Sequence, residues 1–114
     1  MNSYYINAII LNNCPYSLNA QRLLKNNNIN HKIINVDNNN KNNYKTDKIN
    51  TFPQIYLKHK NREGSILLGG YTELNNFINE FKNTKYNIDK INYFINKNNW
   101  NKKATLRLIE LINS

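Results

Sequence analysis

The stretch LNNCPYSLNAQRLL, residues 11–24, contains the only cysteine of this 114-residue chain. Pro15 directly follows Cys14, and proline suits the first position of a helix because the N–H that it lacks has no intrahelical partner there. Three leucines then recur at helical spacing: Leu18, Leu23 and Leu24. The stretch therefore predicts a helix that begins at Pro15, with Cys14 at its cap position.

This placement suits a reactive thiol. A thiol attacks as its thiolate, and the unpaired backbone N–H groups and dipole of a helix N-terminus stabilise that anion. We expect the amides of Tyr16 and Ser17 to point at the sulfur of Cys14. The alternative is an inert, buried cysteine, because free cysteines are often buried.

Segments on both sides of this stretch predict an α/β fold. Apolar residues at helical spacing predict a helix over residues 71–82. The polar segment 37–50 has few apolar residues, although Asp37 could cap a short helix there. Four segments are rich in β-branched and aromatic residues and predict strands: 4–11, 31–36, 53–58 and 65–69. The resulting order is β-α-β-α-β-β-α, with a parallel crossover first and a hairpin last.

Residues 85–114 follow this pattern and predict two amphipathic helices. Their apolar faces consist of Ile88, Ile91, Phe94 and Ile95, then Trp100, Ala104, Leu108 and Leu111. We expect one domain over residues 1–84 and a two-helix extension, residues 85–114, packed on it. Four basic residues should then face solvent: Lys97, Lys102, Lys103 and Arg107. The alternative is that the extension docks a partner.

Composition limits the classes of function. Hydrophobic residues make up 39% of the chain and charged residues 20%, which suffices for a core, and no apolar run is long enough to cross a bilayer. The N-terminal residues lack the pattern of a signal peptide, so we expect a cytoplasmic protein. One cysteine cannot form an internal disulfide or a multi-cysteine zinc site, and no metal site is predicted. The net charge is +9, but lysines scattered among asparagines are typical of A/T-rich codons, so no nucleic-acid partner is expected.

Two further motifs lie at suitable distances from Cys14. In TFPQIYL, which begins at Thr51, a proline opens a strand. This is explained if Pro53 is cis and its loop faces the thiol, leaving the backbone of Phe52 free to pair with an extended peptide. In GGYTEL, residues 69–74, two glycines precede a helix N-terminus, where carboxylates bind readily. Either motif alone would be compatible with a simple turn.

Together, CPYS, TFPQIYL and GGYTEL on this order of elements resemble the glutaredoxin family over residues 4–83. The resemblance implies a thioredoxin fold, with a four-stranded mixed sheet flanked by helices. It also implies a thiol-disulfide oxidoreductase with a redox-active centre that functions in electron transport. The implied co-substrate is glutathione, and the implied partners are glutathionylated or disulfide-bearing proteins. Cys14 matches the nucleophile of the family. The residues that match its glutathione-binding positions are Tyr16, Thr51, Phe52, Pro53, Gly70, Tyr71, Thr72 and Glu73.

The matched positions carry distinct roles in the family. The TFP residues correspond to a loop whose backbone pairs with the cysteine of glutathione. Tyr71 and Thr72 correspond to positions that hold its γ-glutamyl carboxylate. Glu73 stands where the family usually has an aspartate that binds the γ-glutamyl amine.

The sequence also departs from the family pattern. Ser17 replaces the second cysteine of the dithiol motif, which leaves a monothiol mechanism. Leu11 stands where the family usually has a lysine, and Lys41, Lys45 or Lys48 could compensate. Two rival hypotheses remain. One is a non-catalytic dimer that carries a [2Fe–2S] cluster, as CGFS relatives do, although Pro15 is a rigid residue at that position. The other is a structural or docking protein that reuses the fold.

Overall fold

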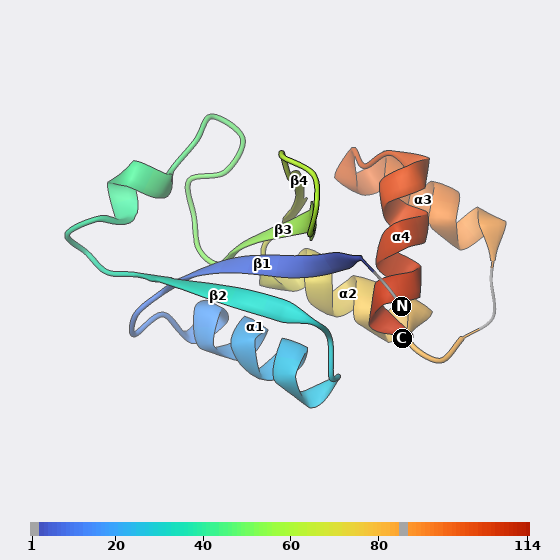
Figure 1. Cartoon of the computed structure of the whole chain (residues 1–114), viewed down its shortest axis with the longest axis horizontal. Helices are drawn as coiled ribbons and strands as arrows, with labels where there is room; N and C mark the ends of the chain where they lie inside the picture. Colours follow the sequence, from blue (N-terminus) through green and yellow to red (C-terminus); the bar gives the residue numbers. More distant parts are fainter. Residues whose placement is uncertain (1–2, 85–86) are drawn as a thin grey trace.

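The computed structural model describes residues 3–84 and 87–114 and confirms the predicted fold class (Figure 1). Its elements are β1 (Tyr4–Leu11), α1 (Pro15–Asn26), β2 (His31–Val36), the 3-10 helix η1 (Lys41–Tyr44), β3 (Gln54–His59), β4 (Ile66–Gly69), α2 (Tyr71–Phe81), α3 (Ile88–Asn98) and α4 (Lys102–Ile112). Within the described ranges, no helix has the length and apolar character that a membrane span requires.

The four strands form one mixed sheet in the order β2-β1-β3-β4. β1 pairs in parallel with β2, and Ile6 lies opposite His31. β1 also pairs antiparallel with β3, where Ile6 lies opposite Leu57, and β3 pairs antiparallel with β4. The crossover and the hairpin predicted from the sequence are therefore both present.

The hydrophobic core lies between the sheet and the helices. Alternate residues of β1 point into it, and Ile6 and Ala8 are fully buried there, as expected from the two-residue period of a strand. α1 and α2 lie side by side below the sheet in Figure 1. They contribute Leu24 and Phe77 to this core. This packing places the N-termini of α1 and α2 near the end of β1 and the start of β3, where the candidate site lies.

The polar segment before β3 differs from the expected helix. It contains the short 3-10 helix η1, which Asp37 does not cap. Instead, Oδ1 of Asp37 accepts hydrogen bonds from the amides of Asn39 (2.8 Å) and Asn40 (3.1 Å). These bonds close a turn, which is the usual behaviour of an aspartate in a polar segment. η1 then begins at Lys41 with Asn40 as its cap residue.

α3 and α4 form as predicted, each with an asparagine at its N-terminus. The side chain of Asn87 accepts from the amides of Asp89 and Lys90, and that of Asn101 accepts from the amide of Ala104. Most of the predicted apolar faces are buried, but Ile88, the first residue of α3, is 40% exposed. The four basic residues expected at the surface are exposed: Lys97, Lys102, Lys103 and Arg107.

α3 and α4 pack into the same hydrophobic core as the sheet. Trp100 packs against Phe77 at a centroid distance of 5.3 Å, and its Nε1 donates a hydrogen bond to the carbonyl of Leu68 in β4 (3.1 Å). Beyond α2, the ammonium of Lys82 donates to the carbonyls of Asn27 and Ile112. The predicted boundary between residues 84 and 85 adjoins residues outside the described ranges, so the division into a domain and an extension stays a prediction.

Candidate active site

Cys14 lies in a tight connection between β1 and α1. Its amide donates to the carbonyl of Leu11 (3.2 Å), and Asn13 adopts a left-handed conformation with φ of 66°. Asparagine tolerates this conformation better than most residues. Cys14 is the N-cap residue and Pro15 is the first residue of α1, as the sequence predicted.

Ser17 fixes the start of α1 to the end of β1. Its side chain is buried, and its Oγ accepts a hydrogen bond from the amide of Leu11 (3.0 Å). From the sequence, Ser17 is recognisable only as the residue that replaces a second cysteine, and this structural role was not predicted. The available signal was the rule that a buried hydroxyl needs a hydrogen-bond partner.

The thiol of Cys14 faces the loop before β3. Its Sγ is 3.9 Å from the carbonyl oxygen of Phe52, to which the S–H can donate weakly, and the Phe52–Pro53 peptide bond is cis, as expected. The expected contact with the helix amides is absent: within the described residues, the side chain of Cys14 makes no capping hydrogen bond. Cys14 is partly buried, and its sulfur lies beside the loop.

The eight residues matched to glutathione-binding positions lie around one cavity of about 330 Å³. They come from three places that are distant in sequence: the first turn of α1, the loop before β3 and the N-terminus of α2. The residues are Tyr16, Thr51, Phe52, Pro53, Gly70, Tyr71, Thr72 and Glu73. The aromatic rings of Tyr16 and Tyr71 are 6.4 Å apart and border the cavity from α1 and α2.

The first residues of α2 line this cavity. The first amides of a helix have no intrahelical partner, and in the described part of the chain the amides of Tyr71 and Thr72 have no protein partner. The amide of Gly70 differs, because it donates to Oε1 of Glu73 at 2.7 Å. Glu73 therefore caps α2 with one carboxylate oxygen, a role that the sequence analysis did not assign to it.

Charge is scarce around the cavity. Of the residues that the structure describes, Glu73 is the only Asp, Glu, Lys or Arg that lines it, so none of Lys41, Lys45 and Lys48 does. Leu11 lines a different cavity, which none of these three lysines lines either. Among the described residues, no cluster of three or more His, Cys, Asp or Glu side chains could hold a metal ion.

This arrangement is suited to thiol-disulfide exchange on a peptide. A cysteine at a helix N-terminus adjoins a loop whose backbone can pair with an extended chain, and a second helix N-terminus can receive a carboxylate. The distance from Cys14 to Phe52 shows that the thiol and the loop are neighbours. A short peptide bonded to Cys14 through sulfur could therefore occupy the cavity.

Comparison with known proteins agrees with this chemistry. The sequence model of the family described as Glutaredoxin matches residues 4–61, just over half of the chain. In structure the chain is similar to glutaredoxin 1 from Francisella tularensis, crystallised in complex with cacodylate, with 23% identity and a TM-score of 0.50 over 68% of this chain and 94% of that one. This likeness shows the fold alone, and no curated protein matches the chain. Since the family match includes both Cys14 and the loop beside it, the chain belongs to the glutaredoxin family of thiol-disulfide oxidoreductases.

Proposed function

We propose that the protein removes glutathione from mixed disulfides by a monothiol mechanism, in a reducing compartment such as the cytoplasm. The observation that carries the proposal is the grouping of all eight matched residues around one cavity beside the single cysteine. Glutathione fits this cavity in three parts. Its γ-glutamyl carboxylate meets the free amides of α2, its backbone pairs with Phe52, and its sulfur reaches Cys14.

The reaction has two exchange steps. The thiolate of Cys14 attacks the glutathionyl sulfur of a mixed disulfide, so that a Cys14–glutathione disulfide forms and the substrate leaves as a thiolate. A second glutathione thiolate then attacks the same glutathionyl sulfur. This step yields oxidised glutathione and regenerates the thiolate of Cys14. Ser17 takes no part, because its hydroxyl is bonded to the amide of Leu11.

The first test compares the wild type with Cys14→Ser. A serine hydroxyl is not appreciably ionised at neutral pH, so glutathione-dependent reduction of a small mixed disulfide should fall to the uncatalysed rate. The buried Trp100 provides a fluorescence control for folding. Equal turnover by the folded variant and the wild type would refute the proposed mechanism.

A second test concerns the charge of Glu73. Glutamine can accept the hydrogen bond from the amide of Gly70 just as glutamate does, so Glu73→Gln keeps the cap of α2 while it removes the negative charge. If the carboxylate binds the γ-glutamyl ammonium, KM for the glutathione mixed disulfide should rise roughly tenfold, with a smaller change in kcat. An unchanged KM would show that Glu73 serves only as a helix cap.

A further inference from the structure

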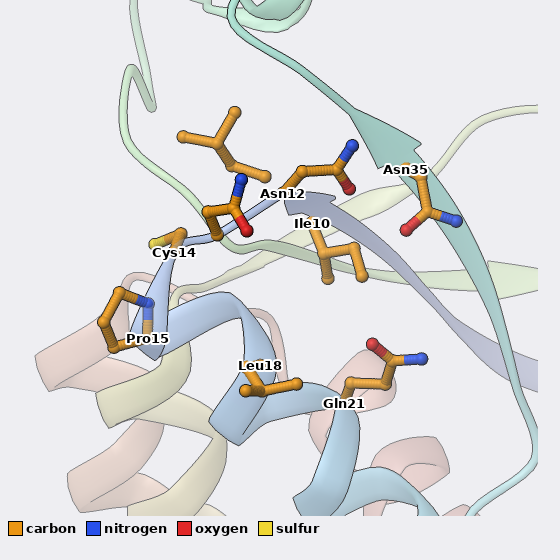
Figure 2. Close-up of a pocket in the computed structure, with 9 residues that line it drawn as sticks. Ile10, Asn12, Cys14, Pro15, Leu18, Gln21 and Asn35 are labelled. Carbon is orange, nitrogen blue, oxygen red and sulfur yellow. The ribbon is translucent and has the colours of Figure 1, made fainter.

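A second cavity, of about 410 Å³, is lined by Cys14 together with residues of β1, α1 and β2 (Figure 2). Cys14 and Pro15 form one wall of it. In Figure 2, Leu18 and Gln21 project from α1 towards Ile10 of β1 and Asn35 of β2. We call this cavity the amide-lined pocket, because four of its lining residues are amides: Asn12, Asn13, Gln21 and Asn35.

The lining of the amide-lined pocket is uncharged. Its other residues are apolar, apart from the thiol of Cys14, and no lysine, arginine, aspartate or glutamate of the described ranges lines it. Leu18 leaves 47% of its area exposed there, although helical spacing alone would have placed it in the core. Leu11, which stands where the family usually has a lysine, also lines this pocket, so the exchange of lysine for leucine makes its wall apolar.

The four amide side chains are free to bind a ligand. Within the described ranges none of them has a hydrogen-bond partner in the protein, and each amide group can both donate and accept. A polypeptide backbone offers the complementary groups, one N–H and one C=O for each residue. The pocket thus combines an apolar surface with hydrogen-bonding groups for a peptide.

We propose that the amide-lined pocket binds an uncharged, apolar side chain of the substrate protein, adjacent to the cysteine that carries the disulfide. This inference rests on the proposed function, because it concerns the partner of the same reaction. The sulfur of Cys14 lies next to Phe52 of the first cavity while Cys14 itself lines the second. When Cys14 attacks a glutathionyl sulfur held beside Phe52, the sulfur of the substrate is one bond farther away, and the residue next to the substrate cysteine is then within reach of the pocket that Cys14 lines.

Glutathione itself is a poor occupant of this pocket. It carries two carboxylates and an ammonium at neutral pH, and burying an ionised group without a charged partner is costly. An apolar side chain avoids that cost and covers Leu18. The amide-lined pocket therefore selects among substrate proteins and does not compete for the co-substrate.

The experiment uses glutathionylated peptides that differ only in the residue next to cysteine, which is leucine, glutamate or lysine. For the full-length protein, kcat/KM for the leucine peptide should exceed that for either charged peptide by about tenfold or more. Gln21→Lys adds a positive charge to the pocket and should narrow the difference in kcat/KM between the leucine and glutamate peptides. The matched control is Asn96→Lys, which adds the same charge at an exposed position of α3 outside every described cavity and should leave the ratios unchanged.

The outcomes separate the two proposals. Turnover of a small glutathione mixed disulfide with equal kcat/KM for the three peptides would overturn the pocket assignment and leave the proposed function intact. If Asn96→Lys changed the ratio of kcat/KM values between the peptides as much as Gln21→Lys, the pocket assignment would also be overturned, because the effect would then come from net charge. Absence of turnover with every mixed disulfide would overturn both proposals.

Discussion

At the N-terminus of α2, the backbone of Gly69 and the side chain of Glu73 occupy adjoining space. Gly69 has φ of 126°, a conformation that other residues rarely adopt, and a Cβ added there would lie 2.5 Å from Oε1 of Glu73. The same oxygen accepts the hydrogen bond from Gly70. The rim of the first cavity therefore depends on the absence of one methyl group.

Gly69→Ala should destabilise the protein by more than Gly64→Ala. Both glycines have positive φ, so both substitutions carry backbone strain of roughly 1 to 3 kcal/mol. Only Gly69 adds a clash, because nothing lies within 4 Å of a Cβ at Gly64. Urea unfolding followed by Trp100 fluorescence measures the difference, and equal midpoints for the two variants would contradict it.

Ser17→Ala should lower the free energy of unfolding by about 1 to 3 kcal/mol, the cost of leaving the amide of Leu11 without a partner. Ser65→Ala, at an exposed position in the hairpin, is the matched control. The shift in urea midpoint at constant slope measures the loss. If both variants unfold at the wild-type midpoint, the Ser17 bond contributes nothing to stability.

At the scale of elements, β1 and β2 have the bounds that their β-branched runs predicted. Such runs are informative because a strand in a sheet must bury them. The segment 37–50 could not be predicted in the same way, since its asparagines favour turns and caps equally. Leu18 shows the limit of periodicity: helical spacing tells which residues share a face, but not how far the sheet covers that face.

The site was predictable to a similar degree. The eight residues that the resemblance to the glutaredoxin family assigned to glutathione binding all line the first cavity, and their role in binding stays a prediction. The cap formed by Glu73 and the anchor formed by Ser17 are tertiary outcomes that depend on side-chain direction. The amide-lined pocket involves β1, α1 and β2 together, and no short motif spans them.

Asn101→Ala should shorten or loosen α4. The side chain of Asn101 accepts a hydrogen bond of 2.7 Å from the amide of Ala104, and loss of such a cap costs about 0.5 to 2 kcal/mol. Asn96→Ala, at an exposed position inside α3, should be neutral or slightly stabilising, because alanine favours helices. Thermal unfolding of both variants tests the prediction, which fails if Asn101→Ala melts no lower than Asn96→Ala.

For the whole molecule, the decisive feature is one core that includes all four α-helices. Phe77 and Phe81 of α2 pack against Phe94 of α3, at centroid distances of 5.6 and 5.3 Å. Leu108 and Leu111 of α4 are also buried. The two C-terminal helices therefore cover apolar surface of α2 that would otherwise meet water.

Truncation after Asn83 should lower the melting temperature and promote aggregation, because it exposes Phe77 and Phe81. The site residues all precede residue 74, so glutathione-dependent activity should persist at temperatures where the shortened chain is still folded. Circular dichroism measures the melting temperature of both forms. A truncated protein that melts with the full chain would show that α3 and α4 are dispensable for the core and would favour a docking role.

The contact between α4 and the rest of the core also determines the order in which the protein can mature on the ribosome. All residues of the two cavities are synthesised before α3 and α4, yet Leu108, Leu111 and Ile112 close the core. A nascent chain therefore already contains Cys14 while the aromatic surface of α2 is still uncovered. Until α4 leaves the exit tunnel, this intermediate exposes apolar surface of the kind that leads to aggregation and that chaperones bind.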